Sequence, residues 1–161
     1  MTAELSGSAL RVSEELRRLG VRSEVLTMPE STRSAREAAS AVRCDIAQIV
    51  KSLVFRSVDR DAAILVLVSG AHRVDEVRLS GIVGGPIERA GGKFVRERTG
   101  YAIGGVPPIG HQEPLPTYLD EHLLAERLVW AAAGTPRTLF CISPEDLLRV
   151  TSAMVVAVAC Q

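Results

Sequence analysis

The sequence predicts an α+β fold in which a mixed, barrel-like β-sheet is surrounded by helices. Apolar segments typical of strands occur in adjoining pairs in the middle and near the end of the chain. Segments with helical spacing precede and follow these pairs. A chain of 161 residues is about the size of one ordinary domain, so we expect a single domain over residues 1–161.

The composition is that of an ordinary soluble protein. Hydrophobic residues make up 47% of the chain, and the scarcity of aromatic residues (4%) indicates a core of Val, Leu, Ile and Ala. The sequence has no apolar run near the roughly 20 residues that span a bilayer, and no signal-peptide pattern. We therefore expect a cytoplasmic protein that does not use a membrane. The formal net charge of zero argues against a general basic field, so any contact with nucleic acid should be local.

Cysteine and histidine patterns give no support for a metal site or a covalent nucleophile. Cys44, Cys141 and Cys160 form no C-x-x-C pair and cannot all pair with one another, so we expect reduced thiols. No H-x-x-x-H motif, Cys/His cluster or G-x-S-x-G elbow occurs. We therefore expect neither a metal nor a cofactor, and any hydrolysis would rely on positioning and on the substrate's own groups.

Helix signals dominate the first 45 residues. Apolar residues recur at helical spacing over residues 8–19 and stop before Gly20, which favours a helix ended by glycine. Ser34 and Glu37 form the S-x-x-E pattern of a capping box, and Asp45 is suited to cap one further turn. The predicted elements are helices at 8–19 and 34–42 and a short strand at 23–27.

From residue 49 onward the pattern changes to strands. Residues 49–56 and 62–69 are rich in strand-forming residues, and the charged residues 59–61 between them indicate a hairpin. A turn-type sequence at 134–136 separates two later strand segments, and Ser143 followed by proline fits the start of a helix. The predicted elements are strands at 49–56, 62–69, 127–132, 137–142 and 154–158, and helices at 74–79, 93–98 and 144–150.

Lys51 is the first candidate functional residue. Only two of the 19 Lys and Arg residues are lysines, Lys51 and Lys93, so lysine is used sparingly. If residues 49–56 form a strand, Lys51 shares one face with Leu53 and Phe55. A lysine on such a face either reaches water from a strand end or lines a pocket where its ammonium meets an anion or a carbonyl. The pattern alone leaves both alternatives open.

The second candidate is the glycine- and proline-rich segment 100–110 (GYAIGGVPPIG). Nine of the 13 glycines lie between Gly81 and Gly110, too concentrated for a linker. Glycines allow backbone amides to approach a ligand, and adjacent prolines stiffen the chain that follows. Such a loop can present amides to an oxyanion or a water, although a tight connection between strands would have the same composition. The segment lacks the P-loop and G-x-G-x-x-G patterns, and His111 directly after it is suited to orient water or a sugar hydroxyl.

Three segments together resemble the YbaK/ProX family, also called the prolyl-tRNA-synthetase-associated or INS-like editing domain. They are residues 45–55 (DIAQIVKSLVF), residues 100–111 (GYAIGGVPPIGH), and residues 133–140 (AGTPRTLF) leading into 143–147 (SPEDL). They occur in the family's order and extend over most of the chain. The resemblance implies a mixed, barrel-like sheet surrounded by helices, and hydrolysis of the ester that joins an incorrect amino acid to the terminal adenosine of tRNA.

The resemblance also implies roles for individual residues. Lys51 would engage the acceptor-end phosphate or carbonyl, and amides near Gly104 and Gly105 would place the ester and an attacking water. The terminal ribose hydroxyl would assist in place of a protein base. Val106 departs from the residue we associate with cysteine-directed members, which leaves the amino acid undetermined. The residues expected to bind substrate are Tyr101, Val106, Pro107, Pro108, His111, Gly134 and Thr135.

These expectations define a trans-acting aminoacyl-tRNA deacylase, because no synthetase motif accompanies them. The expected substrate is a mischarged tRNA-Pro or a similar tRNA, held by its acceptor end, and an aminoacyl-tRNA synthetase is a candidate partner. One alternative is a non-catalytic module of the same fold that binds a nucleotide or a tRNA end. Another is a hydrolase for a different small acyl or nucleotide ester. The sequence does not determine the oligomeric state.

Overall fold

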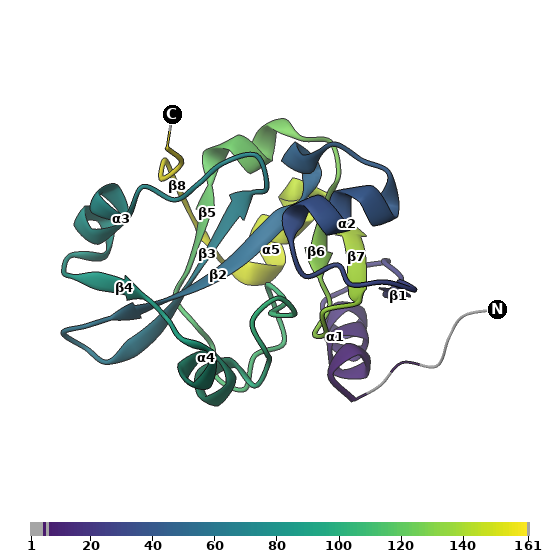
Figure 1. Ribbon diagram of the computed structural model, residues 1–161, viewed down its shortest axis with the longest axis horizontal. Coiled ribbons are helices and arrows are strands. Elements are labelled where there is room, and N and C mark those ends of the chain that lie inside the picture. Colours follow the sequence, from purple (N-terminus) through teal and green to yellow (C-terminus); the bar gives the residue numbers. More distant parts are fainter. Residues whose placement is uncertain (1–4, 6, 161) are drawn as a thin grey trace.

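The computed structural model describes residues 5 and 7–160, and it confirms the predicted α+β class (Figure 1). In this part of the chain, helices surround two β-sheets. The larger sheet has the order β4-β2-β3-β5-β8, with antiparallel pairs at β4-β2-β3 and parallel pairs at β3-β5-β8. The smaller sheet is antiparallel, in the order β1-β7-β6. The strands are β1 Leu26–Thr27, β2 Val50–Ser57, β3 Ala62–Ser69, β4 Ile87–Arg89, β5 Thr117–Asp120, β6 Val129–Ala132, β7 Thr138–Ile142 and β8 Met154–Val156.

The two sheets meet where β2 begins. Ile49, directly before β2, forms an isolated parallel bridge with Trp130 of β6. The described strands do not close into a barrel, so the barrel-like part of the prediction is corrected to two sheets joined at one edge. The reason lies in the short neighbours of β2. In the described part of the chain, β4 pairs only with residues 55–57, and the backbone bridge to β6 is formed by Ile49. Among the described strands, none pairs with the middle of this β2 edge.

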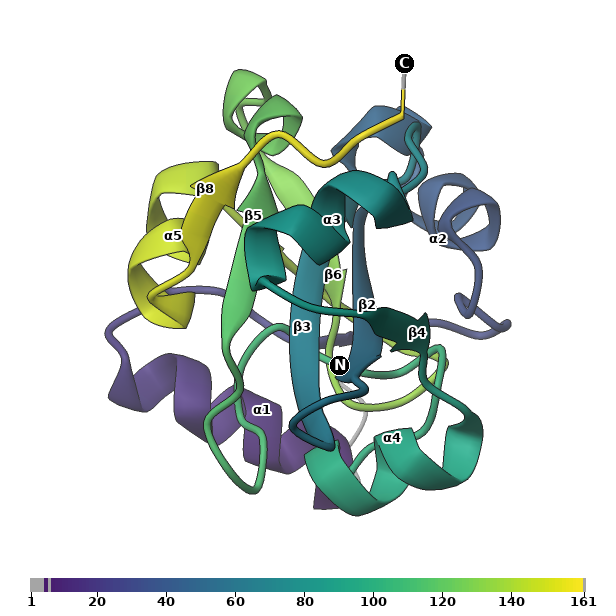
Figure 2. The ribbon, with the colours of Figure 1, turned by 90° about the vertical axis from the view of Figure 1, so that its left-hand side faces the viewer.

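Helices cover both faces of the larger sheet, as Figure 2 shows for α3 in front of it. One core packs α1 and α5 against β2, β3 and β6, through residues such as Val12, Leu65 and Leu147. A second core packs α3 against the opposite face of β2 and β3, and a third, smaller one lies under α2. The helices are α1 Gly7–Arg18, α2 Ala35–Val42, α3 Glu76–Val83, α4 Gly92–Thr99 and α5 Pro144–Thr151, with the 3₁₀ turns η1 Ile46–Gln48 and η2 Glu121–Ala125.

Local signals set the predicted ends of α1, α2 and α5, whereas α3 begins and ends later than the helix predicted at 74–79. The Ser34 hydroxyl accepts a hydrogen bond from the Glu37 N–H, and the Glu37 carboxylate accepts one from the Ser34 N–H, each at 3.1 Å. Ser143 caps α5 in the same way, by accepting from the Asp146 N–H. Gly20 follows α1 with a φ of 77°, a conformation that glycine adopts without strain.

Several short elements differ from the prediction. The strand expected at 23–27 is reduced to β1, and the one expected at 154–158 is reduced to β8. Neither β4, β5 nor η2 was predicted. Strands of three or four residues carry too little periodicity to be recognised, and β5 is formed by pairing with β3 and β8, which are distant in sequence.

Candidate active site

A cavity of about 520 Å³ opens at the uncovered edge of β2. Residues 50–55 of β2 form one side of it, and the start of α2, strands β6 and β7, and the loop carrying Gly104 form the others. Most of the wall is apolar, including Ala38, Val106, Trp130 and Leu139. Cavities of this size and character are typical of small-ligand sites in proteins.

The register of β2 determines which backbone groups face this cavity. Ile49 accepts a hydrogen bond from the Gly70 N–H on the β3 side, whereas Val54 accepts one from the Ala90 N–H on the β4 side. In an antiparallel pair these directions alternate, so the N–H and C=O of Ser52 point toward the uncovered edge. The edge therefore offers a ligand both a backbone donor and a backbone acceptor.

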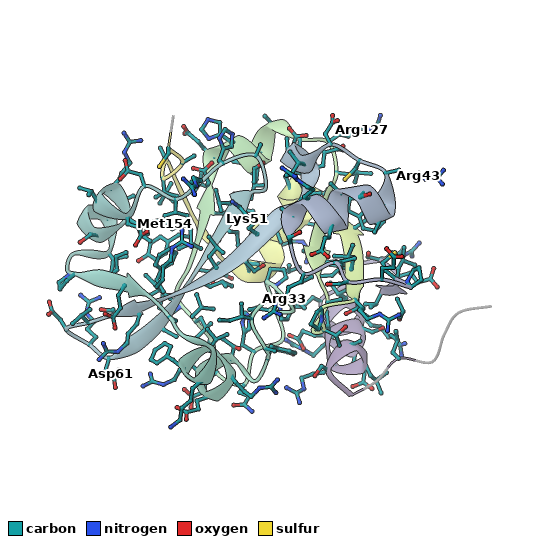
Figure 3. All side chains as sticks on the ribbon, in the orientation of Figure 1. Arg33, Arg43, Lys51, Asp61, Arg127 and Met154 are labelled. Carbon is teal, nitrogen blue, oxygen red and sulfur yellow. The ribbon has the colours of Figure 1, made fainter. Side chains whose placement is uncertain are left out.

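Lys51 belongs to β2 and is labelled in Figure 3. It lines this cavity and is half-buried. Its ammonium donates a hydrogen bond to the carbonyl oxygen of His72, in the loop after β3. Burial lowers the pKa of Lys51, and the positive charges of Arg89 and Arg73 lower it further. An ammonium has three donors, so the bond to His72 leaves others for a ligand. Of the two alternatives for this lysine, the structure favours the pocket.

Gly104 lies on the same cavity and reaches it from the glycine- and proline-rich segment. Its φ of 90° is a conformation that side chains disfavour, and the Arg33 side chain packs directly over it. Gly105 is buried beside the backbone of Thr135. The Gly105 N–H donates to the Ala102 carbonyl at 3.0 Å, and its carbonyl accepts from the Gly134 N–H at 3.0 Å. In this arrangement Gly105 supports the loop, and its N–H does not face a ligand.

The prolines and aromatic rings of the segment form its base. Pro107 and Pro108 are buried. Tyr101 is also buried, and its hydroxyl donates to the Gly110 carbonyl at 2.6 Å. His111 Nε2 lies 2.7 Å from the Pro107 carbonyl oxygen, and burial lowers the pKa of its imidazole. Neither ring lines the cavity, so both lie behind the loop rather than on the site wall.

Gly134 and Thr135 support the loop from the neighbouring turn. Gly134 has a φ of 101° and packs against the backbone of Ser8 in α1. Thr135 shares a hydrogen bond of 2.8 Å with Thr138 through their hydroxyl oxygens. Like Tyr101 and His111, they do not line the cavity. The structure thus brings Lys51, Gly104 and Val106 together on one cavity and sets the other expected residues around its supporting loop.

The sequence analysis missed several residues of the cavity wall. Arg33 and Arg89 are exposed arginines on this wall, and Trp130 is its one indole. The Ser52 hydroxyl is buried and, within the described residues, has no hydrogen-bond partner. Arg33 could have been noticed beside the predicted capping box. Ser52 follows Lys51 in the strand, so its side chain points to the opposite face, and the uncovered edge explains why residues of both faces reach one cavity.

The charges of the cavity define its chemistry. Lys51, Arg33 and Arg89 are its cations, and the described residues that line it include no carboxylate, imidazole or thiol. No group of three His, Cys, Asp or Glu residues suited to a metal ion occurs within residues 5 and 7–160. The site is therefore suited to bind an anion or a polarised carbonyl beside an apolar group. Among the described lining residues, neither a carboxylate nor an imidazole is present to act as a general base.

Within the described ranges, no helix combines the length and apolarity needed to cross a bilayer.

The structure is a small α+β domain with a largely apolar cavity, in which a lysine on a strand lies beside a loop rich in glycine and proline. The family model described as "Aminoacyl-tRNA editing domain" matches residues 29–150, and the chain belongs to this family. Every described residue of the cavity wall falls within the matched range. The resemblance inferred from the sequence is thereby confirmed.

Relatives with similar sequences and structures support this assignment. A crystal structure described as "a putative trans-editing enzyme for prolyl tRNA synthetase" is 50% identical, has a TM-score of 0.92, and is matched over 98% of this chain and 100% of that chain. The "Uncharacterized protein YwhH" of Bacillus subtilis (strain 168) is 28% identical over 77% of this chain and 78% of its own length. The "Putative Cys-tRNA(Pro)/Cys-tRNA(Cys) deacylase EbsC" of Enterococcus faecalis (strain ATCC 700802 / V583) is 27% identical over 74% and 73%.

Proposed function

We propose that this chain is a trans-acting aminoacyl-tRNA deacylase that hydrolyses the ester of a mischarged amino acid on tRNA-Pro or a similar tRNA. The observation that carries the proposal is that Lys51 and Gly104 line one largely apolar cavity. Membership of the editing-domain family supports the reaction class. The relatives described as a prolyl trans-editing enzyme and a Cys-tRNA deacylase support the substrate class.

The charges and shape of the cavity suit the two ends of such a substrate. In an aminoacyl-tRNA, an ester joins the carboxyl group of the amino acid to the ribose of the terminal adenosine, so an amino-acid side chain lies on one side of the ester and a sugar–phosphate backbone on the other. The apolar wall, including Val106 and Trp130, would take the amino-acid side chain. The Lys51 ammonium would hold the ester carbonyl or the acceptor-end phosphate, and Arg33 and Arg89 would attract the backbone.

The reaction would be assisted by the substrate, because the described cavity wall carries no carboxylate or imidazole and Lys51 is assigned to charge stabilisation. A water oxygen attacks the ester carbon, and the bond from that carbon to the ribose oxygen breaks. The neighbouring ribose hydroxyl would accept the proton of the water and pass it to the leaving ribose oxygen. The Gly104 region and Lys51 would stabilise the negative charge that develops on the carbonyl oxygen. Gly105 would act indirectly, by holding the loop in place.

The proposed partner is the acceptor end of a tRNA, and the proposed setting is the cytoplasm, where tRNAs are charged. A prolyl-tRNA synthetase is a candidate partner, supported by the description of the 50% identical structure. The cavity of about 520 Å³ is large enough for the side chain of any of several small amino acids. The mischarged tRNAs that lose their ester will identify the amino acid that is removed.

The alternative is a non-catalytic module that binds a tRNA end or a nucleotide. It is favoured by one observation, the absence of carboxylate, imidazole and thiol groups from the described cavity wall. Binding of an acceptor-stem mimic without ester loss from any mischarged tRNA would support this alternative.

A panel of mischarged tRNAs tests the proposal directly. We expect loss of the ester from at least one of them, and we expect Lys51→Ala to lower the rate by about 10²–10³-fold, the usual effect of removing one donor to a developing charge. Lys93→Ala is the matched control, because Lys93 is the other lysine and its side chain is 89% exposed. Full activity of Lys51→Ala would contradict the proposed role of this lysine.

A further inference from the structure

The position of the Lys51 ammonium depends on a loop outside the cavity. Lysine carries its charge on a flexible stem, so a neighbouring acceptor must fix it in one place. Here that acceptor is the carbonyl oxygen of His72. The backbone of residues 72–75 between β3 and α3 therefore decides where the ammonium lies.

This loop is in turn held by the C-terminal clamp, the name we give to residues 158–160 after β8. Val74 and Ala159 form an antiparallel bridge. The Asp75 N–H donates to the Val158 carbonyl at 2.7 Å, and the Cys160 N–H donates to the Arg73 carbonyl at 2.8 Å. In Figure 2 the segment after β8 crosses beside the chain that leads into α3. Two hydrogen bonds thus fix the loop on either side of Val74.

Asp120, at the end of β5, anchors the clamp. Its side chain is fully buried, and its Oδ1 accepts hydrogen bonds from the N–H groups of Val158 at 2.9 Å and Ala159 at 3.1 Å. Its Oδ2 accepts from the His122 N–H at 3.2 Å and lies 2.8 Å from His122 Nδ1. The His122 ring lies against the ring of His72, with centroids 4.6 Å apart. Asp120 is therefore connected to the His72 loop in two ways, through the C-terminal clamp and through the ring of His122.

We propose that Asp120 is a positioning residue for Lys51. A buried carboxylate is costly to maintain unless hydrogen bonds compensate it, and those bonds lead to the loop whose carbonyl holds the ammonium. Asp120 does not line the cavity and would not touch the substrate. Its role in the reaction rests on the proposed function, whereas its effect on the place of Lys51 does not.

The presence of only two lysines makes this inference measurable without a substrate. Competitive labelling with a trace of acetic anhydride gives the reactivity of Lys51 relative to Lys93 in the same molecule, read from peptides by mass spectrometry. In Ala159→Pro the residue loses the N–H that Asp120 accepts. We expect the Lys51/Lys93 ratio to rise about fivefold, which is about the change in an equilibrium constant that the loss of one hydrogen bond produces.

Two further variants make the result decisive. Ala159→Gly keeps the N–H and is the matched control, so its ratio should stay close to that of the wild type. Asp120→Asn keeps one acceptor oxygen but replaces Oδ2, which accepts from the His122 N–H, by an amide donor. It should therefore raise the ratio while Lys93 reactivity and the melting curve show a folded protein. An unchanged ratio in folded Ala159→Pro and folded Asp120→Asn would overturn the inference. If Ala159→Pro does not fold, Asp120→Asn alone decides it by the same ratio.

Deacylation provides a separate readout that a purely structural role would not reproduce. Positioning through Lys51 predicts that Asp120→Asn lowers the deacylation rate in the wild type and has no further effect on folded Lys51→Ala. If Asp120→Asn lowered the deacylation rate by the same factor in the wild type and in Lys51→Ala, the inference would be overturned. If no mischarged tRNA is hydrolysed, the proposed function fails, while the labelling ratio still decides whether Asp120 positions Lys51.

Discussion

At the scale of single residues, the loop beside the cavity requires glycine at two adjacent positions for two different reasons. A Cβ on Gly104 would lie 2.4 Å from Cγ of Arg33, a flexible side chain, and the residue has a φ of 90°. A Cβ on Gly105 would lie 2.8 Å from the backbone carbonyl carbon of Thr135, which cannot move without the 134–136 turn. A side chain at position 104 is therefore excluded mainly by the positive φ, and one at position 105 by the lack of space beside Thr135.

We expect Gly104→Ala to lower the free energy of unfolding by about 1–2 kcal/mol, the usual cost of a side chain in a left-handed conformation. Gly105→Ala should cost about 1–3 kcal/mol through overpacking, and it should also displace the loop from Thr135. Urea denaturation measures both values. Gly81→Ala is the control, because a Cβ there meets nothing within 4 Å and the residue lies in α3, where alanine should be neutral or stabilising.

Combining Gly104→Ala with Arg33→Ala separates the two causes at this position. Removal of the Arg33 side chain relieves its contact with the new Cβ but leaves residue 104 at a positive φ. Most of the loss in the free energy of unfolding should therefore remain. Full recovery of stability in the double variant would show that contact with Arg33, and not the positive φ, is what excludes alanine.

At the scale of elements, the start of α2 connects helix capping to the cavity. Ser34, Ala35 and Ala38 all line the cavity, and the capping box of Ser34 and Glu37 holds the first turn of this helix. A frayed first turn would therefore change the cavity wall directly. Ser143 caps α5 in the same way but does not line the cavity.

We predict that Ser34→Ala and Ser143→Ala each lower the free energy of unfolding by about 0.5–2 kcal/mol through loss of a helix cap. Only Ser34→Ala should also lower the kcat/KM of deacylation, and by several-fold. Denaturation curves and single-substrate kinetics on the two variants test this. Equal kinetic losses in both would mean that global stability, and not the start of α2, limits activity.

Elements with strong local signals were the ones that the sequence predicted well. The capping box at Ser34, the cap at Ser143 and the long apolar run of β3 each act over a few neighbouring residues, so they are visible without the fold. Strand β5 was missed because its pairing with β3 and β8 comes from distant parts of the chain. The same limit applies to Ser52 and Arg33, which join the cavity only because the neighbours of β2 leave its edge uncovered.

At the scale of the whole molecule, neutral net charge and a cationic cavity occur together. The chain has 19 basic and 19 acidic residues, yet the cavity wall carries Lys51, Arg33 and Arg89 without a carboxylate among its described residues. Acidic groups are instead paired elsewhere, as in the contacts of Asp61 with Arg56 and Arg98. Attraction for a nucleic acid should therefore be confined to the cavity and its rim.

This distribution predicts a shallow salt dependence for acceptor-end binding. Three phosphate contacts on a single-stranded end give a log–log slope of about −2, so affinity should fall by about 20-fold between about 50 and about 200 mM salt. A surface that neutralised about 6–10 phosphates would lose about 10³–10⁵-fold over the same range. Titration of an acceptor-stem mimic at several salt concentrations, followed by Trp130 fluorescence, measures the slope.

Charge-removing variants locate the contacts that produce this slope. Arg33→Gln and Arg89→Gln should each make the slope shallower by about 0.7, the contribution of one phosphate contact on a single strand. Arg127→Gln is the matched control, since Arg127 is exposed and does not line the cavity (Figure 3). A wild-type slope steeper than about −5, left unchanged by both cavity variants, would place the main nucleic-acid contact outside the cavity, because so few cavity cations cannot release that many counterions.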